Sequence, residues 1–187
     1  MSGRALFLVG PSSSGKTTLG HALLATLPEP WLFYESDFTA TFHSPADRFD
    51  LATVEMKLRM TYGTALALRG YLDAGFDLII ERSLWWPEIR QRCARVFDEY
   101  RAYLVGLKWD LTTLGEREHK RTDGIFAGTA RQQVLGWGSD AWDLPYDLVV
   151  DVDNGDAISC AAEVSAWITS DPRPHGIAQL AARPGSA

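Results

Sequence analysis

The stretch Gly10-Pro11-Ser12-Ser13-Ser14-Gly15-Lys16-Thr17 has the pattern G-x-x-x-x-G-K-[ST], and it decides how the rest of the chain is interpreted. It lies between an apolar run of strand length, residues 5–9, and a helix-compatible stretch that ends near residue 27. Glycines let a backbone wrap closely around a phosphate, and the helix that follows contributes the positive end of its dipole. Lys16 offers a charge to the β- and γ-phosphates, and Thr17 offers a hydroxyl to Mg²⁺. We therefore expect a P-loop in which Gly10 to Thr18 bind a nucleoside triphosphate.

The composition narrows the choice of partners. The 187 residues are 46% hydrophobic and 22% charged, which suits one α/β domain with a buried core. A net charge of −6 argues against binding to nucleic acid or to anionic membranes, because both attract basic surfaces. Cys93 and Cys160 lack metal-ligand spacing, and we expect both to be buried, reduced thiols. No signal peptide or membrane span is recognisable, so a cytoplasmic protein with small-molecule partners is expected, while the oligomeric state stays open.

Strand and helix patterns alternate along the chain, which predicts a parallel sheet covered on both faces. Residues 1–170 are expected to form one domain, and the tail at 171–187, rich in Pro, Ala and Gly, shows no sustained helix pattern and is expected to be mostly mobile. The expected strands are 5–9, 31–34, 76–81, 103–109 and 146–152, and the expected helices are 18–27, 51–74, 87–100, 111–122, 129–135 and 156–169.

Two acidic residues follow strand patterns, at the edge of a parallel sheet where ligands gather. Asp37 comes just after the second strand and is a candidate general base for an acceptor hydroxyl; the alternative is that it caps a helix that begins at Phe38. Glu81 ends the third strand and is a candidate ligand of Mg²⁺, directly or through water. The alternative for Glu81 is an ion pair with Arg82.

A basic segment resembles a lid. Arg117 and Arg121 share one face of a predicted helix, and a loop from Gly124 to Gly128 leads on to Arg131. Arginines on a hinged segment at about 115–135 could close over phosphates and expel water. The alternative is a solvated helix in which Glu116 and Glu118 balance the positive charge.

Aromatic residues mark the expected acceptor site. Phe38 and Phe42 follow the second strand, and Trp85 and Trp86 follow the third, so all four are candidates for the wall of an acceptor pocket. Ordinary core packing is an equally good interpretation of these side chains.

The motifs taken together are similar to those of the chloramphenicol phosphotransferase family. The P-loop is followed in order by Leu27-Pro28-Glu29-Pro30-Trp31-Leu32, by Asp37, and by the run from Arg117-Glu118 to Arg131 and Gln132. The resemblance extends over about residues 4–170 and implies a nucleotide-kinase fold with a five-stranded parallel sheet. It also implies an ATP- and Mg²⁺-dependent kinase for a small-molecule hydroxyl, with Asp37 as the base and Lys16 and Thr17 at the phosphates and metal.

The chain departs from the family pattern at three places. The segment at 42–51 is shorter than expected, so chloramphenicol is not assured as the acceptor. Glu81 stands where Asp is expected, and Gly124 stands where a lid arginine is expected, which passes that role to Arg121 or Arg131. An antibiotic-modifying kinase is therefore weighed against a metabolite kinase (nucleotide, shikimate-like or adenylylsulfate-like) and against a nucleotide-binding regulator.

Overall fold

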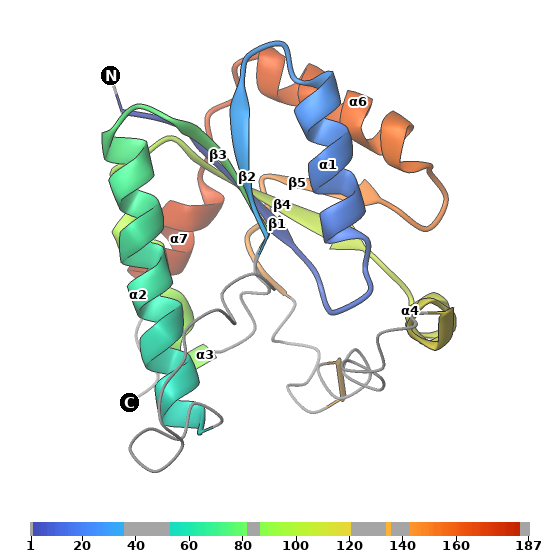
Figure 1. Ribbon diagram of the computed structural model, residues 1–187, viewed down its shortest axis with the longest axis horizontal. Coiled ribbons are helices and arrows are strands. Elements are labelled where there is room, and N and C mark those ends of the chain that lie inside the picture. The colour runs from blue at the N-terminus through green and yellow to red at the C-terminus, as the bar shows by residue number, and fades with distance from the viewer. Residues whose placement is uncertain (1, 36–52, 82–86, 121–133, 136–142, 184–187) are drawn as a thin grey trace.

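Five parallel strands form the centre of the molecule (Figure 1). The computed structural model describes residues 2–35, 53–81, 87–120, 134–135 and 143–183. The order of strands in the sheet is β2-β3-β1-β4-β5, and each neighbouring pair is parallel. This confirms the expected fold class. The strands are β1 (Ala5–Val9), β2 (Trp31–Tyr34), β3 (Asp77–Glu81), β4 (Ala102–Lys108) and β5 (Leu148–Asp151).

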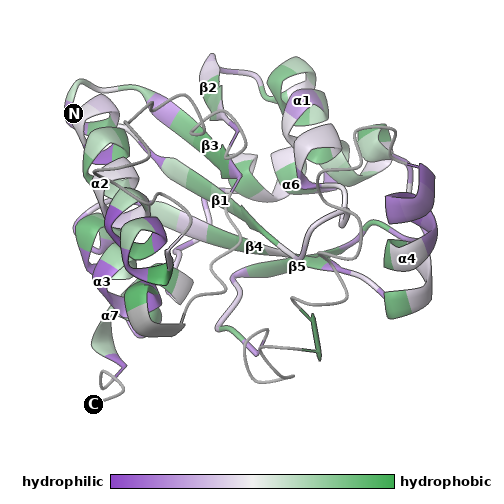
Figure 2. Cartoon of the chain, turned by 60° about the horizontal axis from the view of Figure 1, so that its bottom comes forward, coloured by the Kyte–Doolittle hydropathy of each residue, from purple (hydrophilic) through white to green (hydrophobic). Residues whose placement is uncertain are grey.

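Helices cover both faces of this sheet. Helices α1 (Lys16–Thr26) and α6 (Ala157–Thr169) pack together over one face. Helices α2 (Val54–Asp73), α3 (Pro87–Phe97) and α7 (Gly176–Ala182) cover the other. Helix α4 (Leu111–Lys120) stands apart from both groups, and Figure 2 shows that much of it is hydrophilic whereas the strands are largely hydrophobic.

The central strand β1 explains why both faces are covered. All five of its residues are buried. Ala5, Phe7 and Val9 belong to the core cluster beneath α2, α3 and α7, whereas Leu6 and Leu8 belong to the cluster beneath α1 and α6. Side chains alternate between the two faces of a strand, so an unbroken apolar run can be buried only where both faces are packed.

Side-chain caps define where two of the helices begin. Thr53 accepts a hydrogen bond of 3.3 Å from the Met56 N–H at the start of α2. Asp156 accepts bonds of 2.9 and 2.8 Å from the N–H groups of Ile158 and Ser159 at the start of α6, and these bonds lower the pKa of its carboxyl. Both caps lie within a few residues of the helix starts that the sequence predicts.

The C-terminal tail differs from the expectation of a segment without a sustained helix. Residues 176–182 form α7, in which Ile177 and Leu180 are 2% and 1% exposed. The short repeat of Ile177, Leu180 and Ala181 supports only two turns, so its periodicity is weak in the sequence and the helix depends on tertiary packing.

Both cysteines are buried and neither is in a disulfide, as expected. Burial raises the pKa of the Cys160 thiol. In the described part of the chain, no helix has the length and apolar character needed to cross a bilayer.

Candidate active site

The loop between β1 and α1 has the backbone conformation of a phosphate cradle. Gly15 has φ 91°, in the left-handed region that glycine adopts without strain, and it is the residue from which α1 starts. Ser13 also has a positive φ, 62°, which is uncommon for a residue with a side chain and is often found at functional sites. Within the described residues, the buried hydroxyls of Ser13 and Ser14 have no hydrogen-bond partner. The loop therefore presents polar groups that suit a bound anion.

Lys16 folds back across this loop. Its side chain is 5% exposed, and its Nζ donates a hydrogen bond of 2.8 Å to the carbonyl oxygen of Pro11. The same nitrogen lies 3.9 Å from Glu81 Oε1, and the Glu81 side chain is 8% exposed. A buried cation is thus held at the mouth of the loop by a carbonyl oxygen and a buried carboxylate.

Thr17 and Glu81 form the second contact between the P-loop and the sheet. Thr17 Oγ1 donates a hydrogen bond of 2.8 Å to Glu81 Oε2. The pairing of β1 with β3 places Glu81 opposite Leu8, just before the P-loop begins, which explains why a residue 64 positions away in sequence reaches Thr17. Hydroxyl and carboxylate oxygens are ligands that Mg²⁺ accepts, so this pair fits such an ion. Arg82, the alternative partner of Glu81, lies outside the described residues.

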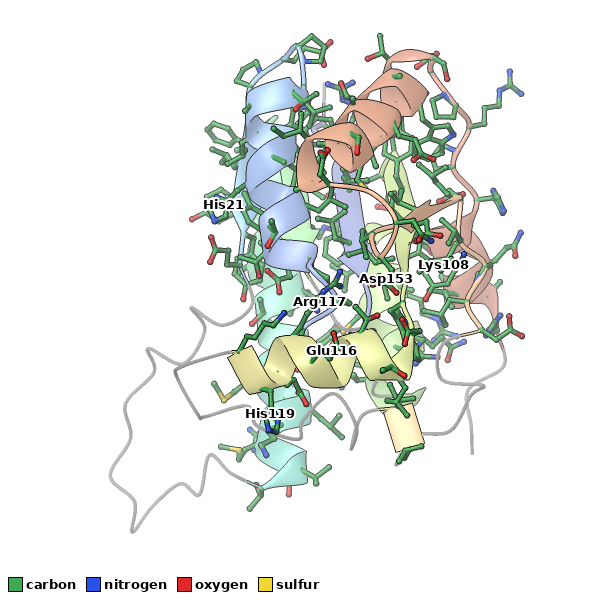
Figure 3. The ribbon with its side chains drawn as sticks, turned by 90° about the vertical axis from the view of Figure 1, so that its right-hand side faces the viewer. His21, Lys108, Glu116, Arg117, His119 and Asp153 are labelled. Carbon is green, nitrogen blue, oxygen red and sulfur yellow. The ribbon has the colours of Figure 1, made fainter. Side chains whose placement is uncertain are left out.

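Arg117 is held by the chain segment that follows β5. Its guanidinium donates a hydrogen bond of 3.1 Å to the carbonyl oxygen of Val152 and forms an ion pair of 3.2 Å with Asp153 Oδ1. Asp153 Oδ2 also accepts a bond of 2.9 Å from the N–H of Asp110, which precedes α4. Figure 3 shows Arg117 and Asp153 on the same side of α4, with His119 on the opposite side. Asp153 therefore fixes both the start and the body of α4.

Asp151 organises the same segment. Its carboxylate accepts bonds of 2.7 Å from Lys108 Nζ and 3.0 Å from Asn154 Nδ2, and its Oδ1 accepts the backbone N–H groups of Asp153 and Asn154. These bonds, led by the one from Lys108, hold the pKa of Asp151 well below its ordinary value. The turn after β5 is thus cross-linked to β4 and to α4.

The acids of α4 differ from one another in burial. The side chain of Glu116 is exposed, as a solvated helix would have it, but Glu118 is only 8% exposed. The alternative of a fully solvated helix, with both glutamates in water, therefore fits Glu116 but not Glu118.

Most of the expected acceptor and lid residues lie outside the described residues. Among the other expected site residues, Lys16 and Thr17 follow the carboxyl end of β1 and Glu81 ends β3, whereas Arg117 of the expected lid contacts Val152, just after β5. These positions lie at the carboxyl edge of the sheet, where the sequence predicts the site. The ones outside are Asp37, Phe38, Phe42, Trp85, Trp86, Arg121 and Arg131.

Sequence reasoning missed several contacts of this region. The carbonyl of Pro11 and the carboxylate of Asp153 were not among the candidates, although Asp153 follows the last strand and so satisfied the strand-end rule. His21 was not among the candidates either, yet its Nε2 lies 2.8 Å from Glu35 Oε1, two residues before Asp37. A lone histidine in a helix carries no sequence signal of such a partner.

Comparison with known proteins places this geometry in a family. Residues 3–169 match the family model described as chloramphenicol phosphotransferase-like protein. The chain belongs to this family. Proteins named "Putative O-phosphotransferase" from two strains of Mycobacterium tuberculosis are each 26% identical to this chain. Each alignment is 209 residues long and spans 97% of this chain and 89% of the relative.

Several solved structures with the same fold are kinases by name. A sugar kinase from Janibacter sp. HTCC2649 superposes with a TM-score of 0.65 and 21% identity, covering 89% of this chain and 95% of that one. The Mycobacterium tuberculosis APS kinase CysC superposes with a TM-score of 0.64 and 15% identity, covering 90% of this chain and 98% of that one. The family confirms the expectation of a small-molecule kinase, and the structural likeness confirms the P-loop kinase fold.

Proposed function

We propose that the protein transfers the γ-phosphoryl group of ATP, with Mg²⁺, to a hydroxyl group of a small molecule. The observation that carries this proposal is the contact of one buried carboxylate, Glu81, with both Lys16 and Thr17. In phosphoryl transfer, a protein contributes mainly by positioning the reactants and by neutralising charge. The contact holds the Lys16 ammonium group beside the oxygen atoms of Thr17 and Glu81, which can bind a metal ion. Family membership supports the same reaction class.

Each residue has a proposed part in the reaction. Lys16 and the backbone N–H groups of residues 10–18 other than Pro11 hold the phosphates, and the buried hydroxyls of Ser13 and Ser14, which have no hydrogen-bond partner among the described residues, lie in the same loop. Thr17 and Glu81 would hold Mg²⁺, which when bound neutralises phosphate charge. Asp37 is the proposed base that accepts the proton of the acceptor hydroxyl, and Arg121 and Arg131 are the proposed mobile cations.

Arg117 has a narrower part than the sequence predicts. Because its guanidinium is bound to Val152 and Asp153, we propose that it holds α4 against the turn after β5. The role of meeting the transferring phosphoryl group then falls to Arg121 or Arg131.

A binding experiment and an acceptor screen test the proposal. Titration calorimetry with ATP and GTP, with and without Mg²⁺, should show Mg²⁺-dependent binding that is weakened in Lys16→Met. Release of ADP should then be followed across hydroxylated antibiotics, nucleosides, sugars and other central metabolites. ADP release that responds to no acceptor, despite tight nucleotide binding, would instead indicate a nucleotide-binding regulator.

The acceptor class and the location are proposals of the same kind. An antibiotic hydroxyl, as the family name suggests, is the first candidate, and the kinase names of the structural neighbours favour including sugars and sulfate-bearing nucleotides in the screen. The acidic net charge of −6 favours small-molecule substrates over nucleic acid or a membrane surface. Two buried cysteines outside any disulfide suit a cytoplasmic enzyme.

A further inference from the structure

The last residue of β2 carries a buried hydroxyl group without a partner. Tyr34 ends this strand, and its hydroxyl oxygen is buried and has no hydrogen-bond partner among the described residues. Its ring packs against the core cluster that lies beneath α2 and α3. An unpaired buried hydroxyl lowers stability, because it has lost its hydrogen bonds to water and gained none in return. Such atoms are uncommon in folded proteins, and a role in binding or catalysis is one physical reason for them.

Two other side chains show that position matters as well as the missing partner. Tyr100 packs against the same cluster just before β4, at the amino edge of the sheet, and its hydroxyl donates a hydrogen bond to Asp73. Trp31 Nε1 is also buried without a partner among the described residues, but Trp31 begins β2 and so lies at the amino edge. Tyr34 lies at the carboxyl edge, where ligands gather in parallel sheets.

The register of the sheet places Tyr34 beside the expected phosphate site. Ile80 of β3 is paired with Phe7 of β1 on one side and with Tyr34 of β2 on the other. Glu81, the next residue, contacts two side chains of the P-loop helix. Strands lie about 4.8 Å apart and residues about 3.3 Å apart along a strand, so the Cα atoms of Tyr34 and Glu81 are roughly 6 Å apart.

Tyr34 and Glu81 nevertheless serve opposite faces of the sheet. Glu81 is paired with Leu8 and contacts α1 through Thr17, whereas Tyr34 packs on the face covered by α2 and α3. Figure 1 shows α1 and α2 on opposite sides of β2. In phosphoryl transfer the attacking and leaving oxygens are roughly in line. Because the P-loop would hold the leaving phosphates on the α1 side, the acceptor approaches from the face on which Tyr34 lies.

We propose that the Tyr34 hydroxyl binds a hydroxyl or carbonyl oxygen of the acceptor and thereby helps to select it. This inference rests on the proposed function. A phenol hydroxyl both donates and accepts hydrogen bonds, so it can bind either kind of oxygen. The proton of the reacting hydroxyl passes to the proposed base, Asp37, three residues further along the chain. The contribution of Tyr34 is affinity for the acceptor.

The test removes one oxygen atom. Tyr34→Phe should keep or raise the melting temperature of the wild type, because no hydrogen bond within the protein is lost. It should raise the acceptor KM by about three- to tenfold, the usual effect of one hydrogen bond to an uncharged group, while kcat and the KM for ATP stay unchanged. The acceptor probes are chloramphenicol, D-gluconate and adenosine, which represent the antibiotics, sugars and nucleosides of the screen.

Tyr100→Phe is the matched control, since it removes the same atom from a tyrosine of the same cluster. It should lower the melting temperature, because the bond to Asp73 is lost, and leave the acceptor KM unchanged. The inference is wrong if Tyr34→Phe lowers the melting temperature as the control does, or if Tyr34→Phe keeps the wild-type acceptor KM.

A binding measurement separates this inference from the proposed function. If the wild type phosphorylates none of the probes, the proposed function fails for them. Calorimetric titration of the same probes in the presence of a non-hydrolysable ATP analogue then tests Tyr34 without catalysis. Weaker binding of a probe to Tyr34→Phe than to the wild type supports the inference. Equal binding, or no binding of any probe to the wild type, overturns it.

Discussion

Thr17 Oγ1 donates a hydrogen bond of 2.8 Å to Glu81 Oε2, which joins the first turn of α1 to the last residue of β3. The other oxygen of the same carboxylate lies 3.9 Å from Lys16 Nζ. One acidic side chain thus contacts both groups that the P-loop motif assigns to phosphate and metal. The consequence is that charge at position 81 should govern how metal and nucleotide bind together.

The first prediction concerns that charge. Glu81→Gln keeps the shape of the side chain but removes a negative charge, so we expect Mg²⁺ to enhance nucleotide binding less than in the wild type, because hard cations prefer carboxylate oxygens. Binding of ATP without Mg²⁺ should be retained. Calorimetric titrations at increasing Mg²⁺ concentrations measure both quantities, and an identical Mg²⁺ dependence in the two proteins would remove Glu81 from the metal site.

The second prediction separates the catalytic and structural parts of Lys16. Lys16→Met should lower turnover by about 10²–10³-fold, the usual cost of losing one preorganised electrostatic contact. Lys16→Ala should be equally inactive but less stable, because it leaves a void beside the buried Glu81 carboxylate. Turnover and thermal unfolding measured on both variants test this, and a folded variant with normal turnover would contradict it.

The third prediction concerns Asp37. If it is the base, Asp37→Asn should lower acceptor phosphorylation by on the order of 10²-fold or more, while the affinity for ATP barely changes. Steady-state kinetics and a binding titration supply the two numbers. Parallel loss of ATP binding would identify Asp37 as a metal-binding or structural residue.

The fourth prediction distinguishes a structural role of Arg117 from a catalytic role of Arg121. Arg117→Lys cannot reproduce the fork that binds both Val152 and Asp153, so it should lower stability, with a coupling to Asp153 of about 0.2–1 kcal/mol in a double-mutant cycle. If Arg121 meets the charge on the transferring group as proposed, Arg121→Lys should instead lower turnover more than ATP affinity, because lysine cannot bind phosphate oxygens in the bidentate way that arginine can.

Limited proteolysis provides an independent check on the arginines. A non-hydrolysable ATP analogue with Mg²⁺ should slow cleavage between Thr122 and Thr129 if the segment closes over nucleotide. Unchanged cleavage, together with full turnover in Arg121→Lys and Arg131→Lys, would place the catalytic cation elsewhere.

The fifth prediction is a pH dependence of stability. The folded pKa of Asp151 lies below its ordinary value of 3.8, mainly because Lys108 donates to it. Its stabilising contribution is therefore complete above that value and is lost as the pH falls through the lower, folded pKa. Asp151→Asn should lower the free energy of unfolding at pH 7 and reduce its loss on acidification. Chemical denaturation at pH 7 and pH 3 tests this, with Asp98→Asn, on the exposed turn after α3, as the control.

Local signals were sufficient for much of the fold. The apolar run at 5–9, the P-loop glycines and the regular alternation of strand and helix patterns predicted the parallel sheet, because these features act over a few residues. The same strand-end reasoning selected Glu81 and Asp37. Helix α7 was missed because two turns give too few apolar positions to establish a period, and its stability comes from Leu104, Asp147 and α3.

The sequence alone determined that a phosphate-binding loop lies between a buried strand and a helix, since the residues that form it are consecutive and their backbone needs are local. Tertiary structure alone decided the partners of its side chains. Glu81 reaches Thr17 only because β3 pairs with β1, and Arg117 binds Asp153 only because the turn after β5 lies against α4. Pairing between distant segments follows from the packing of the whole sheet, and no spacing within either segment encodes it.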